Sequence, residues 1–270
     1  MPPIFPYRRE VESVVDMIDA YWFGAREENG LVYSVSGNDP GWRDGEERIV
    51  DYPEAVRLYR WGYHAADSWL NALESVPGPI ACRVRLEVAF RNNDGKMVGP
   101  RRLLVEHADA SRELRLFAAD CAEHALLRER FVGREPDQRS WDAVEVVRQF
   151  ARGEISAETL LTAYDAARYA TDVVSYNVSA YYAANAASSA AGGAAAGAAY
   201  AVYAAYITAA SARVAYPAVA YNGYSDFASS MGSVSTAAVA DQISERAWQS
   251  ERLNYWMEQA FSRKVTAANA

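Results

Sequence analysis

The sequence has few residues of the kinds that build disulfides or metal sites. Only two cysteines, Cys82 and Cys121, occur in 270 residues, and they form no CxxC pair. We therefore expect both thiols to be reduced and buried, in a cytoplasmic protein. Cys121 and His124 are three residues apart on an expected helix and could form half of a zinc site, but no second pair completes it. Core packing with a hydrogen-bonded imidazole is the favoured interpretation, and no metal is predicted.

Motifs of common catalytic and nucleotide sites are also missing. The sequence has no Gly-x-Ser-x-Gly elbow, no Walker loop and no strand-linked Gly-x-Gly-x-x-Gly. Residues Met1 to Pro6 lack a basic region followed by a long apolar core, so we expect no secretory signal. The net charge of −8 argues against nucleic acid as a ligand. It is compatible with a basic protein partner, although solubility alone also explains it.

What the chain has instead is a tract from Ala170 to Asp226 that is rich in alanine, tyrosine, serine and glycine. Between Asp172 and Asp226 the only charged residue is Arg213. Residues spaced four and three apart predict a helix with one packing seam: Tyr169, Val173, Tyr176, Ala180, Ala183 and Ala187. Because alanine buries little area, neighbouring helices must approach closely to be stable. The tract therefore predicts a tight helical hairpin.

The arms of this hairpin are expected near residues 157–189 and 194–214, with the turn at Gly192 and Gly193. Pro217 then ends the second arm. Gly193 and Gly197 also have the spacing of paired membrane helices, but nearby serines and the lack of a basic flank favour close packing of soluble helices. We expect no membrane partner, and an uncovered alanine seam favours pairing with a second copy of the chain.

The first half of the chain mixes short helical and strand patterns. Helices are expected from Glu10 to Tyr21 and from Ala66 to Ser75. The alternation of apolar and polar residues predicts four strands, at Leu31–Val35, Ile49–Val50, Ile80–Phe90 and Lys96–Glu106. The turn residues Asn92 to Gly95 would join the last two strands as an antiparallel hairpin. The loop around Trp42 is long and charged, so we expect it to be exposed.

From residue 110 onward the pattern is helical. Helices are expected from Ala110 to Phe131, from Pro136 to Phe150, after a Ser156 cap, and from Val239 to Phe261. The buried face of the last helix would use Ile243, Ala247, Leu253, Trp256 and Phe261. The fold class is therefore α+β: a small, mainly antiparallel sheet domain in residues 1–110, followed by an alanine-rich helical bundle in residues 111–270.

Several segments of the helical half resemble an uncharacterised bacterial and phage family labelled as immunity proteins. They are Phe117–Leu126, Glu135–Ser140, Arg148–Ser156 and the closing Glu245–Gln249. Members of that family also continue into alanine-rich helices. The resemblance covers roughly residues 115 to 260. It implies a protein-binding inhibitor.

The N-terminal half is similar to a second uncharacterised phage family through Trp61–Ala65, Pro77–Glu87 and Asp94–Val98. The first of these segments also resembles the core of ADP-ribosyltransferases. That resemblance implies NAD as a cofactor, His64 in place of the nicotinamide-stacking tyrosine, and Glu106 as the catalytic glutamate. No earlier histidine stands where the NAD ribose would be contacted, so an inactive relative of those enzymes is the alternative.

The leading functional prediction is a non-enzymatic, protein-binding protein of a phage or bacterial conflict system, similar to an immunity protein or inhibitor, with no cofactor. Its recognition loops would be residues 37–47, 59–64 and 92–96, and its binding residues would be Trp42, Arg60, Trp61 and His64. Two alternatives stay open. One is an NAD-using transferase or its inactive relative, and the other is a self-assembling, phage-associated structural protein that associates through residues 200–224.

Overall fold

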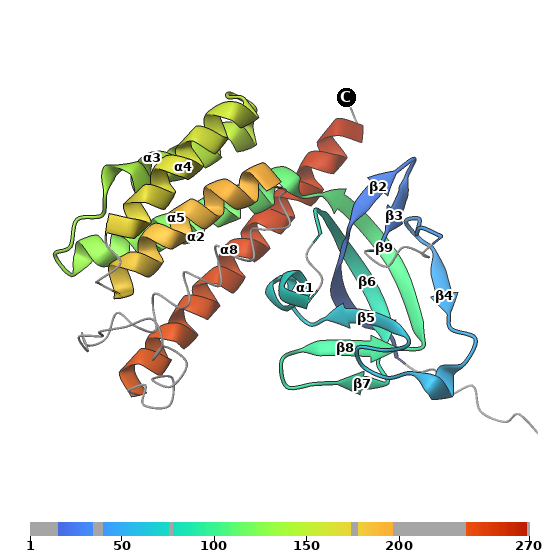
Figure 1. The fold of residues 1–270 in the computed structure, drawn as a ribbon. Coiled ribbons are helices and arrows are strands. Elements are labelled where there is room, and N and C mark those ends of the chain that lie inside the picture. Colours follow the sequence, from blue (N-terminus) through green and yellow to red (C-terminus); the bar gives the residue numbers. More distant parts are fainter. Residues whose placement is uncertain (1–15, 35–39, 76–77, 174–177, 197–235, 269–270) are drawn as a thin grey trace, which may run out of the picture.

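The computed structural model describes residues 16–34, 40–75, 78–173, 178–196 and 236–268. The fold is α+β, as the sequence predicts. An antiparallel sheet lies in the N-terminal half and a group of helices forms the C-terminal half (Figure 1). The long last helix runs from the helices to the sheet and contacts both.

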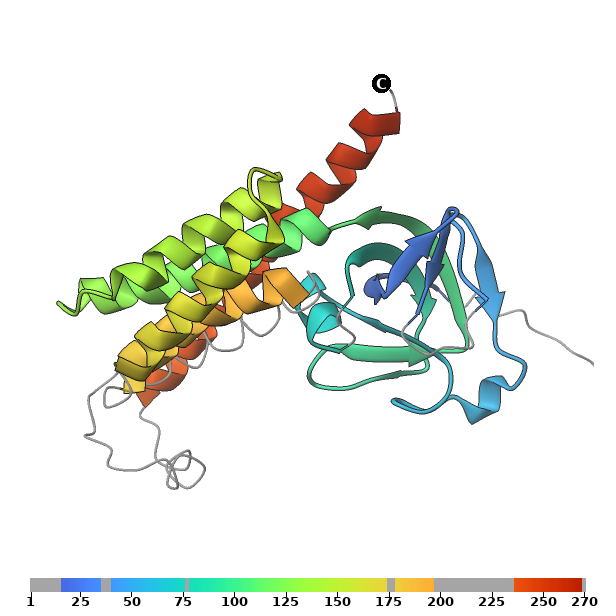
Figure 2. The same ribbon diagram turned by 45° about the horizontal axis from the view of Figure 1, so that its top comes forward.

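The main sheet has seven strands in the order β4-β9-β6-β1-β5-β8-β7, and each pairing in the described residues is antiparallel. Figure 2 shows that this sheet is strongly curved. A separate two-stranded ribbon is formed by β2 and β3. The strands are β1 Ile18–Gly24, β2 Arg26–Glu28, β3 Leu31–Tyr33, β4 Glu47–Ile49, β5 Tyr63–Ala66, β6 Ile80–Glu87, β7 Phe90–Arg91, β8 Lys96–Gly99 and β9 Arg101–Asp109.

The two faces of the sheet belong to two apolar clusters. Trp22 and Met97 belong to a cluster on one face, together with Trp42 from the loop before β4. Phe23 and Ala81 lie on the other face and pack with the helices. Because side chains alternate along a strand, neighbouring residues such as Trp22 and Phe23 serve different clusters. The sheet is therefore buried on both sides along β1.

The expected helix from Glu10 to Tyr21 is wrong where the structure describes it. Residues 1–15 lie outside the described part, but Ile18–Gly24 forms β1, which pairs with β6 from Ile18 opposite Leu86 to Gly24 opposite Ile80. A strand covered on both faces carries a nearly continuous apolar run, and this run also fits a helical spacing. The seven paired positions outweigh the local helical pattern.

The predicted antiparallel pairing after β6 is present, but the short strands β7 and β8 lie between β6 and its partner β9. Strand β6 pairs with β9 from Ile80 opposite Asp109 to Glu87 opposite Arg101. The predicted single strand from Lys96 to Glu106 is split at Pro100, which has no N–H to donate to a ladder. Its first part, β8, pairs with β7 and with β5. The Asn92–Gly95 turn joins β7 to β8, with Asn92 Oδ1 accepting from Lys96 N at 2.8 Å.

The short elements of the sheet half begin or end near their predicted positions. Strand β3 covers Leu31–Tyr33, β4 covers Glu47–Ile49, and a 3-10 helix, η1, covers Pro53–Ala55. Helix α1, Trp69–Ser75, is shorter than predicted because Ala66 belongs to β5. It buries Trp69, Leu70 and Leu73 against the helix-facing side of the sheet.

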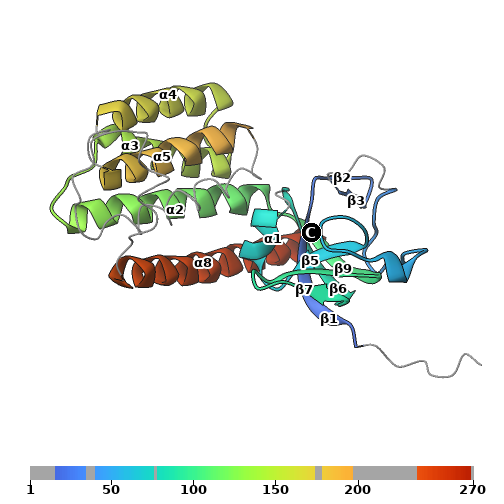
Figure 3. The same ribbon diagram turned by 60° about the horizontal axis from the view of Figure 1, so that its bottom comes forward.

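The helices of the second half begin and end largely as their cap residues predict. They are α2 Ser111–Phe131, α3 Gln138–Arg152, α4 Ala157–Val173, α5 Val178–Ala196 and α8 Thr236–Ala268. The Asp137 side chain accepts from Arg139 N at 2.9 Å, and Gly153 ends α3 with φ 77°. Ser156 Oγ accepts from Thr159 N at 3.3 Å and caps α4. Figure 3 shows α4 outermost, then α3 and α5, then α2, with α8 beyond α2.

The expected turn of the alanine hairpin is wrong. Gly192 and Gly193 lie inside α5, and the two described helices of this region, α4 and α5, pack against each other. Gly192 is needed because a Cβ there would lie 2.9 Å from the ring of Tyr164. The seam also differs, since Tyr169 is 58% exposed while Ala187 is fully buried. The second arm beyond Ala196, together with Pro217, lies outside the described residues.

Helix α8 uses a different buried face from the predicted one. Leu253 and Phe261 are buried as expected, but Ile243 is 65% exposed. The polar residues Glu245 and Gln249 take its place in the interface, because α2 presents charged partners there. One apolar cluster contains residues from both sides of residue 110, including residues of α1, α2 and α8. The division at 110 thus marks a change of secondary structure within a shared core.

Candidate functional site

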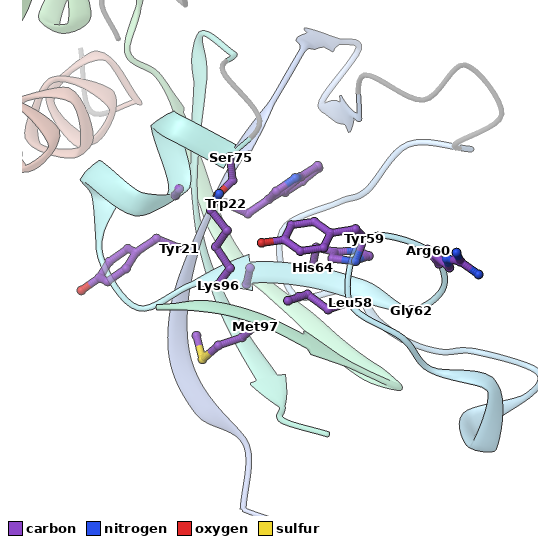
Figure 4. A pocket seen from close by; sticks show the side chains of 12 residues that line it. Tyr21, Trp22, Leu58, Tyr59, Arg60, Gly62, His64, Ser75, Lys96 and Met97 are labelled. Carbon is purple, nitrogen blue, oxygen red and sulfur yellow. The ribbon is translucent and has the colours of Figure 1, made fainter. Parts of the chain in front are cut away.

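A pocket of about 410 Å³ opens beside the sheet, between α1, the strands β1, β5 and β8, and the loop at residues 58–62. Figure 4 shows the hydroxyl of Tyr59 and the amine end of Lys96 directed into the space that these elements surround, whereas Arg60 points away. The lining residues are Tyr21, Trp22, Leu58, Tyr59, Arg60, Gly62, His64, Ala65, Ala72, Ser75, Lys96 and Met97. The lining is thus mainly aromatic and apolar, and none of it is acidic.

One wall of the pocket is a tight backbone hairpin from Arg57 to Trp61. Arg57 N donates to Trp61 O at 2.9 Å, and Trp61 N donates to Arg57 O at 3.1 Å. The short reversal places Tyr59 at φ 64°, a left-handed conformation that is unfavourable for a residue with a Cβ. Gly62 follows at φ 115°, where a Cβ would lie 2.8 Å from Val98. The hairpin is therefore folded closely onto β8.

His64 holds this hairpin in place. Its Nε2 accepts a hydrogen bond from Tyr59 N at 2.9 Å, so the neutral ring carries its proton on Nδ1. Burial lowers the pKa of His64; the hydrogen bond with the Gly62 backbone opposes this change, and the positive charge of Arg102 adds to it. The imidazole is therefore neutral at pH 7 and orders the pocket wall.

Two hydrogen-bond donors are directed into the pocket. The ammonium of Lys96 lies 5.8 Å from the Tyr59 ring centroid and has no carboxylate partner among the described residues. Tyr59 Oη accepts from Asn92 Nδ2 at 3.2 Å, which leaves its own hydrogen to donate. Trp22 also lines the pocket and is 6% exposed. These donors suit an anionic ligand.

The structure brings three of the four predicted binding residues to this end of the sheet. Arg60 and His64 line the pocket, and Trp61 lies in the hairpin with 46% of its surface exposed. Glu106, the glutamate of the transferase alternative, lies on β9, which β6 and β1 separate from His64 on β5. Its Oε1 accepts from Arg83 Nη1 at 2.6 Å. His64 and Glu106 therefore do not line one pocket.

Trp42 is not an exposed binding residue, contrary to the sequence prediction. Only 1% of it is exposed, and its backbone pairs with Val32 in both directions at 2.8 Å. Two guanidinium groups lie over its ring, Arg48 at 4.4 Å and Arg102 at 4.3 Å from the centroid. The charged loop is thus buried at its tryptophan because arginines stack on the indole.

Arg102 is a structural residue that the sequence analysis missed. It is 4% exposed and lies 4.2 Å from the Trp22 ring and 5.2 Å from the Tyr63 ring, in addition to its contact with Trp42. Its Nη1 donates to His64 O at 3.0 Å, which connects the aromatic cluster to the pocket wall. The sequence signal for this role is an arginine at an inward-facing position of a strand with alternating apolar residues.

The segments of the immunity-family resemblance meet in the helical half. Asp120 accepts from Arg148 Nη2 at 2.9 Å, Arg252 Nε at 2.6 Å and Trp256 Nε1 at 2.8 Å. His124 Nδ1 lies 2.9 Å from Glu245 Oε2. These residues come from α2, α3 and α8, and Asp120 connects the three helices through its contacts with Arg148, Arg252 and Trp256.

Both cysteines are buried and free, as predicted. Burial raises the pKa of Cys82 and Cys121 well above the ordinary value. His124 stacks on Trp248 with ring centroids 4.1 Å apart. Across the described ranges, no group of three metal-binding side chains comes together.

No family model, curated protein or solved structure matches this chain. Among the helices that the structure describes, none has the length and apolar character needed to span a bilayer.

Proposed function

We propose that this protein is a non-enzymatic, cytoplasmic protein-binding protein, similar to an immunity protein or inhibitor, and that it binds its partner at the pocket end of the sheet. The observation that carries the proposal is the Arg57–Trp61 hairpin. It presents Tyr59, 65% exposed, and Trp61, 46% exposed, beside a pocket whose lysine, Lys96, has no carboxylate partner within the described ranges. Exposed aromatic residues around a pocket are typical of binding hot spots.

The strain of the hairpin supports this assignment. Tyr59 keeps φ 64° although glycine would adopt that conformation at lower cost. Backbone strain of this kind persists when the surroundings fix it, and it is common at binding sites. His64 provides that constraint through its bond to Tyr59 N, so the aromatic side chain is displayed in one orientation.

The composition of the chain is compatible with a basic partner. With a net charge of −8, the chain attracts a basic protein at long range. The likeness of residues 115 to 260 to immunity proteins points to the same class of function. In this proposal the helical half supports the sheet through α8, and pairing with a second copy through the alanine helices is a separate property.

Site-specific crosslinking tests the proposal. A photoreactive phenylalanine replaces Trp61 in one variant and Phe131, which is 92% exposed on α2, in a control variant. We expect a crosslinked partner in the producing cell from position 61 and none from position 131. The product should disappear when Tyr59→Ala is added. Crosslinks that form from position 131 alone would place the binding surface on the helices and contradict the proposal.

A further inference from the structure

The residues that line the pocket are suited to one particular group of a partner protein. We propose that it binds the C-terminal residue of the partner chain, with the terminal carboxylate at Lys96 and the side chain over the apolar lining. This inference rests on the proposed function and names the group that the partner presents.

The polar side of the pocket favours a carboxylate. Lys96 supplies a positive charge, and the Tyr59 hydroxyl supplies a neutral donor. Hydrogen bonds to an ionised acceptor are stronger than neutral ones, and none of the lining residues is acidic. His64 adds no charge, because its Nε2 accepts from Tyr59 N. The ligand therefore meets one positive charge and one neutral donor, and the two oxygens of a carboxylate can accept from both.

The apolar side of the pocket favours a ligand that carries an apolar group in addition to a carboxylate. Leu58, Ala65, Ala72 and Met97 line the same space. A volume of about 410 Å³ also lies within the range typical of pockets that enclose small ligands. A C-terminal residue carries its carboxylate and its side chain on one Cα, so it can occupy both parts at once. An acidic side chain would leave the apolar part empty.

The charge of the whole protein distinguishes the two sources of a carboxylate. A chain with net charge −8 repels a partner surface rich in acidic side chains. Every protein chain ends in a carboxylate, however basic the rest of it is. A basic partner can therefore be attracted as a whole and still deliver an anion to Lys96.

Small probes of known composition test this inference by NMR on the isotope-labelled full chain. N-acetyl-leucine carries a free terminal carboxylate, N-acetyl-leucinamide lacks it, and N-acetyl-glutamic acid α-amide carries a carboxylate only on its side chain. We expect N-acetyl-leucine to shift the signals of the Trp22 indole and the Gly62 amide. Its amide should bind at least about tenfold more weakly because the charge-assisted bonds are lost.

One variant in the pocket and one outside it provide the matched comparison. Lys96→Gln should weaken the binding of N-acetyl-leucine at least about tenfold, because it removes the positive charge directed into the cavity. Arg112→Gln removes a charge from the exposed surface of α2, outside the pocket lining, so affinity should change by less than about twofold. Unchanged spectra of both free variants would confirm that the fold is intact.

Three results would overturn the inference. Equal binding of the acid and the amide would show that no carboxylate is recognised. Tighter binding of the glutamic acid α-amide would assign the pocket to an acidic side chain. The absence of shifts with any probe would show that the pocket takes no such residue. If the probes fail while crosslinking from position 61 still captures a partner, the proposed function stands without this pocket chemistry.

Discussion

Charged residues have different partners in the helical half and at the pocket end of the sheet. In the helical half, Asp120 is 7% exposed and accepts from Arg148, Arg252 and Trp256. At the pocket, Lys96 and Arg60 have no carboxylate partner in the described part of the chain. Charges that are neutralised internally hold helices in register, whereas charges without a partner are available to an external ligand. The comparison separates residues that maintain the fold from those that can bind.

The two regions should also respond differently to mutation. Removing one member of a buried ion pair leaves its partner charged in a medium of low polarity, which is costly. Removing a charge from an exposed rim costs little stability because water already solvates it. Stability and binding should therefore change separately in the two regions.

The largest effect is expected at Asp120. Asp120→Asn removes the charge that two arginines share, and we expect the free energy of unfolding to fall by about 3 to 5 kcal/mol. Urea unfolding measures it, and Asp94→Asn, at an exposed turn position, is the control. A loss below about 1 kcal/mol would mean that solvent compensates the arginines, and the contrast between the regions would not hold.

The two tryptophans that the sequence analysis treated as equivalent provide the second test. Trp42→Phe should destabilise the protein by about 1 to 3 kcal/mol, because the smaller ring leaves space between Arg48 and Arg102. Trp61→Ala should change stability by less than about 0.5 kcal/mol, since the residue is half-exposed. Partner binding should be lost only with Trp61→Ala. Thermal unfolding measures the stability of each variant, and a pull-down from the producing cell measures its partner binding.

Much of the fold was predictable because it depends on local signals. Cap residues such as Asp137 and Gly153, and the turn at Asn92, specify their elements through hydrogen bonds within a few residues. The strand at Ile18–Gly24 was not predictable in this way, because its pairing partner, β6, is distant in the sequence. Gly192 was misread as a turn because its contact with Tyr164 is also non-local. Tertiary packing decided both cases.

The candidate site was predictable in part for the same reason. The segment from Arg60 to His64 was identified from its aromatic composition, and it does line the pocket or its rim. Lys96 ends the predicted recognition loop at residues 92–96, but its place beside His64, like that of Trp22, depends on the strand order. Trp42 was placed on the surface because its loop is charged, and the stacking of Arg102 from β9 could not be read from that loop.

A smaller effect, of opposite sign, is expected at the strained residue of the hairpin. Tyr59→Gly should raise the free energy of unfolding by up to about 1 kcal/mol, because glycine adopts φ 64° without the Cβ penalty. The same change removes the exposed ring, so partner crosslinking from position 61 should fall. Calorimetry measures the stability. A protein that loses both stability and binding would indicate that the Tyr59 ring supports the fold through Lys96 and Asn92.

The smallest effect concerns the pH dependence of the hydrogen bond from Tyr59 N to His64 Nε2. Burial lowers the pKa of His64 below its ordinary value of 6.5, with Arg102 acting in the same direction and the Gly62 hydrogen bond opposing it. The unfolded chain therefore takes up a proton at higher pH than the folded one. The stabilisation is complete above pH 6.5 and is lost as the pH falls through the lowered pKa.

His64→Asn isolates this contribution, because its amide oxygen can still accept from Tyr59 N without titrating in this range. The stability difference between the wild-type protein and the variant should shrink from about pH 7.5 to about pH 5. Urea unfolding at several pH values measures this difference. Partner crosslinking from position 61 should also decrease as the pH falls. A difference that stays constant with pH would show that the hairpin is held without the neutral imidazole, and the strain at Tyr59 would then need another source of support.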